Sequence, residues 1–170
     1  MKTRIVEAEV ADVPEILRFI KELARFEKLE HEVVASEDAL RETLFGERNY
    51  AEVVFVEEDE ERVPFALFFH NYSTFLGRPG LYLEDLYVRP EKRGNGYGKL
   101  LLRHLALLTL ARGCGRLEWW ALDWNLGAID FYRSFGAEAM SDWTVYRLSG
   151  DALKRLATVA AASAGPESVG

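Results

Sequence analysis

The sequence has few of the features that mark secreted, membrane-spanning or nucleic-acid-binding chains. Its one cysteine, Cys114, cannot form a disulfide within the chain, which favours a reducing compartment. No apolar run approaches the ~20 residues of a membrane-spanning helix, and charges from Arg4 onward interrupt any signal-peptide pattern. Basic residues are outnumbered 21 to 28, and the net charge of −7 argues against a nucleic-acid surface. We expect a cytoplasmic protein that binds neither nucleic acid nor membrane.

What the chain does have is a series of strand and helix patterns, and its 170 residues suffice for one core. The order of these patterns predicts an α/β (α+β) fold with a mixed sheet, not a doubly wound one. We expect a single domain over residues 1–156 and a flexible tail over residues 157–170. The expected strands are Thr3–Ala8, Ala51–Val56, Val63–Tyr72, Leu81–Val88, Arg116–Leu122 and Trp143–Leu148; the expected helices start at Asp12, Ser36, Lys99, Gly127 and Asp151.

The turn Arg93–Gly98 carries three glycines at every second position, between the strand Leu81–Val88 and an apolar helix. Glycine lets the backbone curl tightly and present its N–H groups to a ligand beside the positive end of the helix. The turn therefore predicts an anion site, although such turns also serve geometry alone. The Walker pattern fails because Leu100 stands where a hydroxyl residue is needed, and the dinucleotide pattern fails in both registers.

The spacing Arg93-x-x-Gly96-x-Gly98 resembles the pyrophosphate loop of the GCN5-related N-acetyltransferases, the GNAT superfamily. A second segment, Asn125 to Ala137, resembles that superfamily's motif N-x-x-A-x-x-F-Y-x-x-x-G. The resemblance implies the GNAT fold, with a mostly antiparallel sheet and splayed central strands, and implies acetyl-CoA as co-substrate without a metal. At Leu126-Gly127 the chain departs from the Glu-Pro of many members.

The resemblance also implies roles for individual residues. Tyr132 would be the general acid for the CoA sulfur, because a phenol, with an ordinary pKa of about 10, stays protonated at neutral pH. A backbone N–H near Tyr87 or Val88 would stabilise the oxyanion. The alternatives are that Tyr132 is a packing aromatic and that Asn125 is a helix N-cap. The implied cofactor-binding residues are Leu86, Tyr87, Val88, Arg93, Gly94, Asn95, Gly96, Tyr97, Gly98, Lys99, Asn125 and Ala128.

A narrower resemblance, over Ile16–Ala24, Phe45–Glu47 and Leu81–Leu86, is to the spermidine/spermine (diamine) and thialysine acetyltransferases. It implies a primary-amine acceptor, which arrives as an ammonium with a pKa of about 10.4 and must lose a proton. By this resemblance Glu84 is the expected catalytic carboxylate, which holds the cation and passes its proton to water. Strand alternation puts Asp85 on the opposite face, in a supporting role.

The remaining expected acceptor contacts follow the same resemblance. Phe26 stands where the diamine enzymes have a tyrosine, Glu27 matches their acidic neighbour, and Asp142 is a further acidic candidate. The acidic run Glu57–Glu61 is interpreted as a solvated hairpin tip, and we assign it no function.

Two other functions stay open at this point. In the first, the enzyme acetylates the amine of a peptide or an antibiotic. In the second, the chain is a non-catalytic regulator that binds CoA, and the presence of Glu84 and Tyr132 speaks against it. The helix from Leu100 to Leu110 is apolar nearly all round, which predicts burial on two sides. Together with the family's habit, this predicts a homodimer.

Overall fold

The computed structural model describes residues 3–162, with side chains as far as residue 158. It consists of two compact units, residues 1–122 and residues 123–170, and we describe each by itself.

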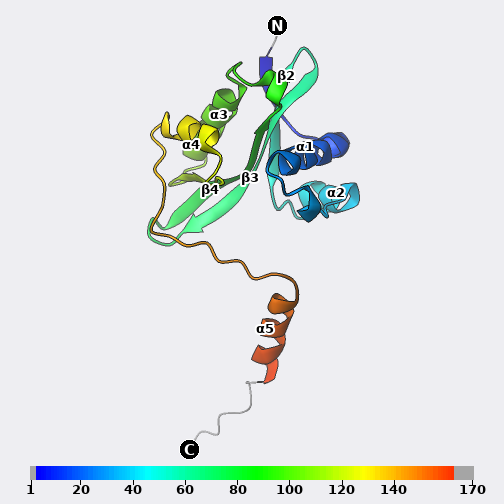
Figure 1. The fold of residues 1–170 in the computed structure, drawn as a ribbon, viewed down its shortest axis with the longest axis vertical. Coiled ribbons are helices and arrows are strands. Elements are labelled where there is room, and N and C mark those ends of the chain that lie inside the picture. Colours follow the sequence, from blue (N-terminus) through cyan, green and yellow to red (C-terminus); the bar gives the residue numbers. More distant parts are fainter. Residues whose placement is uncertain (1–2, 163–170) are drawn as a thin grey trace, which may run out of the picture. The chain divides into compact units, whose positions relative to one another are not determined.

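The first unit is built on a five-stranded sheet whose spatial order follows the sequence order (Figure 1). Three neighbouring pairs are antiparallel and the last pair, β4 with β5, is parallel. This confirms the predicted mixed and mostly antiparallel sheet. The strands are β1 (Thr3–Glu7), β2 (Glu52–Glu58), β3 (Glu61–Ser73), β4 (Arg78–Val88) and β5 (Leu117–Trp119).

β4 and β5 pair over only part of their length. Leu81 to Leu83 face Leu117 to Trp119, but β4 continues to Val88 while β5 ends at Trp119. In the described part of the chain, residues 84–88 therefore have no strand partner on the β5 side. Backbone polar groups that a sheet leaves unpaired must find water or a ligand, and this unpaired stretch agrees with the splayed central strands that the resemblance implied.

Helices cover both faces of the sheet (Figure 1): α1 (Val13–Phe26) and α2 (Glu37–Phe45) lie on one face and α3 (Tyr97–Ala111) on the other. Pro14 occupies the first turn of α1, where its missing N–H breaks no helical hydrogen bond. Ser36 caps α2 by accepting from the N–H of Ala39 at 3.2 Å. Short 3-10 helices form at Val10–Asp12, Glu30–Glu32 and Pro90–Lys92.

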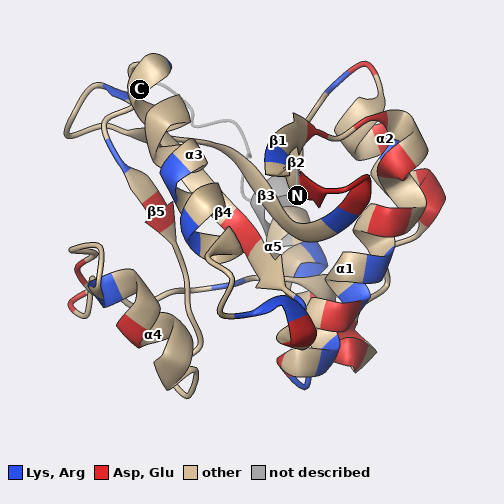
Figure 2. Ribbon diagram, turned by 90° about the horizontal axis from the view of Figure 1, so that it is seen from above, with Lys and Arg blue, Asp and Glu red and all other residues tan. Residues whose placement is uncertain are grey.

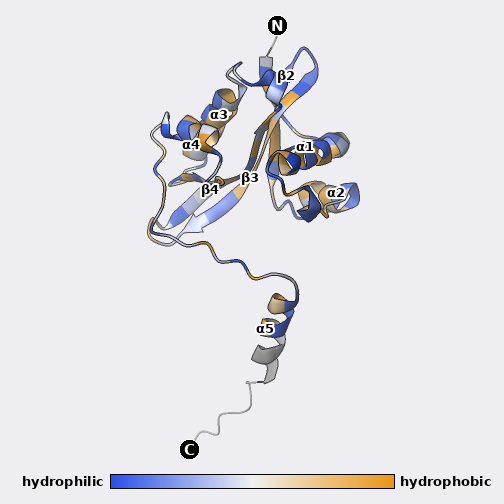
Figure 3. Ribbon diagram, viewed as in Figure 1, coloured by the Kyte–Doolittle hydropathy of each residue, from blue (hydrophilic) through white to orange (hydrophobic). Residues whose placement is uncertain are grey.

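The main core lies between α1, α2 and the sheet. Phe19 is fully buried, stacks on Phe65 with ring centroids 5.2 Å apart, and meets the edge of Tyr87 at 6.3 Å. Figure 3 shows the apolar residues concentrated where β3 and β4 pass between the helices. Truncating such a buried aromatic typically costs about 3–5 kcal/mol, so this cluster fixes α1 on the central strands.

α3 buries one face and exposes another. Leu101, Leu102 and Leu105 are buried, whereas Leu107 is 57% and Leu110 75% exposed. In the single chain the sheet covers one side of this helix, and the second side, for which burial by another subunit was predicted, is exposed.

The second unit contains α4 (Leu126–Arg133) and α5 (Gly150–Ala162). The predicted strand Trp143–Leu148 is wrong: these residues form no strand, and Trp143 (69%) and Tyr146 (91%) are largely exposed. An alternating pattern alone does not make a strand, because a strand also needs a neighbouring strand to pair with. The described part of this unit contains no such strand. α5 continues to Ala162, past the expected start of the tail at residue 157, and residues 163–170 lie outside the described part.

Candidate active site

The glycine turn after β4 adopts the geometry that its sequence requires. Gly94 and Gly96 both have φ of +80°, in the left-handed region that side chains with a Cβ rarely adopt. A Cβ at either position would meet nothing within 4 Å, so the space in front of the turn is open. Gly96 is also the N-cap of α3 and has no side chain to accept from the first-turn amides. These N–H groups and the helix dipole remain available to an anion.

The side chains of this turn are directed back to the protein. Arg93 donates from Nε to the carbonyl of Val88 at 3.0 Å, and its guanidinium lies 4.6 Å from the ring centroid of Phe26. Asn95 donates to the carbonyl of Lys92 at 3.0 Å. These contacts hold the turn against β4 and the end of α1, and they leave the recognition of an anion mainly to the backbone.

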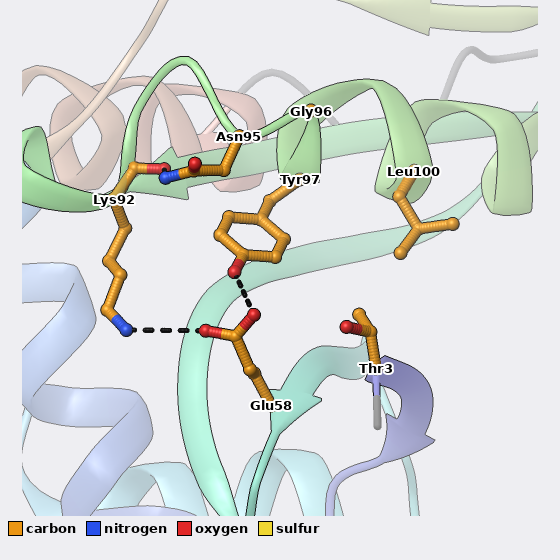
Figure 4. A pocket seen from close by; sticks show the side chains of 7 residues that line it. All are labelled: Thr3, Glu58, Lys92, Asn95, Gly96, Tyr97 and Leu100. Carbon is orange, nitrogen blue, oxygen red and sulfur yellow. Dashed lines mark hydrogen bonds and ion pairs between the residues drawn. The ribbon is translucent and has the colours of Figure 1, made fainter. Parts of the chain in front are cut away.

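An acidic hairpin, residues Glu57–Glu61 between β2 and β3, fixes the other side of the turn (Figure 4). Tyr97 donates its hydroxyl to Glu58 at 2.5 Å, and Lys92 pairs with the same carboxylate at 3.4 Å. The hydrogen bond to Glu58, with burial, raises the pKa of Tyr97 to about 12. We assigned this acidic run no function from the sequence. In the structure, it anchors the glycine turn.

Beside this anchor lies a pocket of about 390 Å³, lined by Glu58, Lys92, Gly96, Tyr97 and their neighbours (Figure 4). Its wall carries the Glu58 carboxylate, which would repel a diphosphate. We therefore place the anion site at the backbone amides of the turn and not in this pocket.

The expected oxyanion donors lie on the stretch of β4 that extends beyond β5. Tyr87 is 6% exposed, with its ring in the core against α1, while Leu86 and Val88 are partly buried. Burial raises the pKa of the Tyr87 phenol. The backbone of this stretch borders the glycine turn, so an N–H near Tyr87 or Val88 and the turn amides can contact one extended ligand.

A β-bulge interrupts β4 at Glu84. Leu83 faces Phe68 on β3, and Asp85 faces Leu67, so Glu84 has no partner across the ladder. Phe68 lies on the α3 face, below the guanidinium of Arg112, whereas Leu67 belongs to the core under α1. The extra residue therefore turns both Glu84 and Asp85 to the α1 face. The prediction that they point to opposite faces is wrong, because it assumes an uninterrupted strand.

On that face, Asp85 lies within electrostatic reach of Glu84 and of Glu27, which follows the last residue of α1. Burial, then the charges of Glu84 and Glu27, raise the pKa of Asp85 to about 7, and burial raises the pKa of Glu27. Within the described chain, none of the three side chains forms an ion pair or a hydrogen bond. Carboxylates that lie together without a counter-ion are costly and mark a functional site for a cation.

α1 is held against the end of β4 by Arg89. Its guanidinium pairs with Glu22 at 2.9 Å and Glu15 at 3.2 Å, and lies 4.5 Å from the ring centroid of Phe19. These contacts tie α1 to the end of β4. They fix the position of Glu27 relative to the two carboxylates of the bulge.

Three aromatic rings lie next to the carboxylates, one from each of β3, β4 and the segment after β5. The ring centroid of Tyr82 is 5.0 Å from that of Phe69 and 5.8 Å from that of Trp120. Burial and the charges of Glu84 and Glu118 raise the pKa of Tyr82. This aromatic group was not predicted from the sequence, since its members are far apart in the chain. An aromatic surface beside carboxylates suits an organic cation.

The charge distribution of the first unit separates an expected anion site at the glycine turn from an expected cation site at the bulge. α3 contains Lys99 and Arg103 and no acidic residue (Figure 2). The segment that follows α1 is acidic, with Glu27, Glu30, Glu32, Glu37 and Asp38 against Lys28. A basic helix at the glycine turn favours an anionic ligand and an acidic segment beside the bulge favours a cationic one.

Residues 17–137 match the acetyltransferase (GNAT) family, which covers more than half of the chain. The chain belongs to the GNAT acetyltransferase family.

Relatives and solved structures agree with this assignment. This acetyltransferase is 39% identical to a thialysine N-epsilon-acetyltransferase of Mus musculus over 91% of this chain and 97% of that one. It is 32% identical to the Homo sapiens spermidine/spermine N(1)-acetyltransferase-like protein 1, over 91% of this chain and 24% of that protein. A solved Vibrio cholerae integron cassette protein shares its fold with a TM-score of 0.78 and 28% identity, over 92% of this chain and 98% of that one.

The residues of this acetyltransferase fit acetyl-CoA, the acetyl donor of its family. The open space at Gly94 and Gly96 and the uncapped start of α3 suit a diphosphate, and the free edge of β4 suits an extended chain. In the described residues no group of three or more histidine, cysteine or acidic side chains is arranged to hold a metal ion. No helix in that part is long and apolar enough to cross a membrane.

The other predicted residues of this acetyltransferase belong to the second unit. Asn125 is the N-cap of α4 and accepts from the N–H of Ala128 at 3.3 Å, so the N-cap interpretation is confirmed. Tyr132 lies on the same helix, partly buried, with its ring centroid 5.3 Å from that of Phe131. Asp142 is exposed, in a turn between α4 and α5.

Proposed function

We propose that this acetyltransferase transfers the acetyl group of acetyl-CoA to a primary amine of a small diamine, polyamine or lysine-like amino acid such as thialysine. The observation that supports it most is the group of unpaired carboxylates, Glu27, Glu84 and Asp85, on the face of β4 toward α1. An alkylammonium supplies the positive charge that this group lacks. The relatives named for thialysine and for spermidine/spermine support the same acceptor class.

The proposed chemistry assigns each step to a residue of the chain. The turn amides from Gly94 to Lys99, with the edge of β4 from Leu86, orient acetyl-CoA, which supplies an activated acetyl group. A carboxylate of the β4 bulge takes the proton from the ammonium, because only a neutral amine is a nucleophile. An N–H near Tyr87 or Val88 stabilises the oxyanion, and Tyr132 gives its proton to the departing CoA sulfur.

The acceptor is bounded by residues around the bulge. Phe26, whose ring lies under Arg93, offers an apolar contact where the diamine enzymes have a hydroxyl. Glu27 and Asp85 attract the cation, and Asp142 is proposed as a further acidic contact. Without a hydroxyl group at residue 26, we expect an acceptor that presents methylene groups there, since a polar group of the acceptor would lose its hydrogen bonds to water against the apolar ring.

A thiol-release assay tests the proposal with thialysine, ornithine, spermidine and putrescine beside a basic peptide and an aminoglycoside. We expect turnover on at least one of the four small amines and a higher KM on the peptide and the aminoglycoside. Turnover on the peptide or the aminoglycoside alone would move the acceptor to that class. Binding of acetyl-CoA by calorimetry without turnover on any amine would support the non-catalytic regulator instead.

The exposed face of α3 carries a second proposal, that the protein forms a homodimer in the cytoplasm. Leu107 and Leu110 are exposed apolar residues on a helix whose other face is buried, and a second copy would remove them from water. Light scattering checks the mass. A monomer at micromolar concentration would contradict the dimer and leave the acetyl transfer untouched.

A further inference from the structure

We propose that Asp85, and not Glu84, is the residue that takes the proton from the acceptor amine, while Glu84 and Glu27 hold the ammonium beside it. The inference rests on the proposed function, since it assigns a role within the same acceptor site. The resemblance to the diamine acetyltransferases implies Glu84 as the base. The bulge changes that assignment, because it brings the neighbouring acid to the same face.

The position of Asp85 is the first argument. It faces Leu67 across the β3–β4 ladder, on the side of the α1 core, and it is partly buried, whereas Glu84 is exposed as the extra residue of the bulge. Shielding a carboxylate from water disfavours its charged form and so raises its affinity for a proton, which a general base requires.

The charges around Asp85 are the second argument. Glu84 acts on it from its own strand and Glu27 from the end of α1, while β3 presents the uncharged Leu67. Burial, and then these two negative charges, raise the pKa of Asp85 to about 7. A base with a pKa near the working pH combines a deprotonated population with a useful proton affinity.

The absence of internal partners is the third argument. In the described part of the chain, Asp85 accepts no hydrogen bond from another side chain and pairs with no cation. Its oxygen atoms are therefore available to the N–H of a bound ammonium. The proton moves from the nitrogen to a carboxylate oxygen, which leaves a neutral amine and a carboxylic acid, and the acid then loses its proton to water.

The experiment compares Asp85→Asn, Glu84→Gln and Glu27→Gln in the intact protein, with kcat/KM for the best amine of the panel measured from pH 5.5 to 9. We expect Asp85→Asn to lower kcat/KM by about 10²- to 10⁴-fold, as the loss of a general base does. Glu84→Gln should mainly raise KM for the amine. It should also move the acidic limb of the profile down by on the order of one pH unit, because a negative neighbour is removed. Glu27→Gln should move the limb in the same direction by less.

Two controls keep the outcomes separate. Glu42→Gln removes a carboxylate from the exposed face of α2 and should change neither KM nor the limb. Calorimetry with acetyl-CoA shows whether each variant is folded and binds the donor. A Glu84→Gln variant that binds acetyl-CoA but has lost turnover, beside an active Asp85→Asn variant, would overturn the assignment. If the wild-type protein acetylates none of the small amines, the proposed function has failed before any variant is made.

Discussion

Tyr97, in the first turn of α3, donates a hydrogen bond to Glu58, which lies 39 residues earlier at the end of β2. The same carboxylate pairs with Lys92 on the other side of the glycine turn. Glu58 thus holds both flanks of a turn whose own glycines would leave it flexible. A turn that is fixed before the ligand arrives loses less entropy when it binds.

Removing this hydrogen bond should weaken acetyl-CoA binding. We expect Tyr97→Phe and Glu58→Ala each to raise the Kd about 3- to 10-fold, which corresponds to about 1 kcal/mol for one hydrogen bond. The double variant should be little worse than the Glu58 variant alone, because that variant already removes the contact with Tyr97. Calorimetry measures the three values. Tyr50→Phe, on an exposed tyrosine, is the matched control, and fully additive losses would argue against a shared contact.

Replacing Asp85 with Asn should stabilise the fold at alkaline pH. An aspartate in an unfolded chain titrates near 3.9, whereas Asp85 titrates near 7 in the folded protein. Between these values the folded chain holds the extra proton, so this residue lowers stability as pH rises from about 4 to about 7, and fully above 7. The partly exposed site reduces the effect to on the order of 2 kcal/mol, or about 4–8 °C in Tm.

Thermal unfolding at pH 8 and pH 4 checks this expectation. The gain of Asp85→Asn should be present at pH 8 and vanish at pH 4, where the wild-type carboxyl is already protonated. Asp130→Asn, on the exposed side of α4, should show no such difference. An equal Tm change at both pH values would mean that packing, and not the charge, is responsible.

Trp120→Ala should raise KM for long acceptors more than for short ones. The ring of Trp120 lies against Tyr82 beside Glu84, where it can cover the methylene chain of an amine held at the carboxylates. We expect about a 10-fold rise in KM for spermidine and a smaller one for putrescine, since each buried methylene contributes about 0.8 kcal/mol. Trp143→Ala is the control. Equal effects on both amines would exclude a contact with the chain.

Tyr132→Phe should lower kcat without lowering the affinity for acetyl-CoA. The phenol is proposed as the proton donor to the CoA sulfur, and the loss of a general acid costs about 10²- to 10⁴-fold. Stopped-flow or steady-state thiol release gives kcat, and calorimetry gives the Kd. Tyr146→Phe, at an exposed tyrosine, controls for the loss of a hydroxyl. If kcat stayed unchanged, Tyr132 would be a packing residue as its contact with Phe131 also allows.

Local signals in the sequence were enough to predict most of the fold. Ser36 caps α2 as expected, and the glycine turn stands between β4 and α3 because its glycines alone tolerate the left-handed backbone. α3 begins at Tyr97, two residues before the predicted start at Lys99, because the left-handed Gly96 already forms its N-cap. Periodicity and caps depend on neighbouring residues, so they can be read along the chain.

The site was predicted less completely, because its decisive contacts are not local. The side to which Glu84 and Asp85 point depends on the register with β3, and alternation along one strand cannot reveal a bulge. The contact of Glu58 with Tyr97 spans a long stretch of chain and has no periodic signature. The wrong prediction of a strand at Trp143–Leu148 has the same origin, because an alternating segment does not show which strand it would pair with.

The bulge at Glu84 makes the chemistry of this enzyme depend on how many residues β4 contains, as well as on which ones. Deleting Glu84 would let the ladder with β3 run unbroken and would leave Asp85 opposite Leu67 without its acidic neighbour. Such a shortened protein should unfold at a higher temperature but bind the amine more weakly, so redesign for thermostability must leave this irregular strand unchanged.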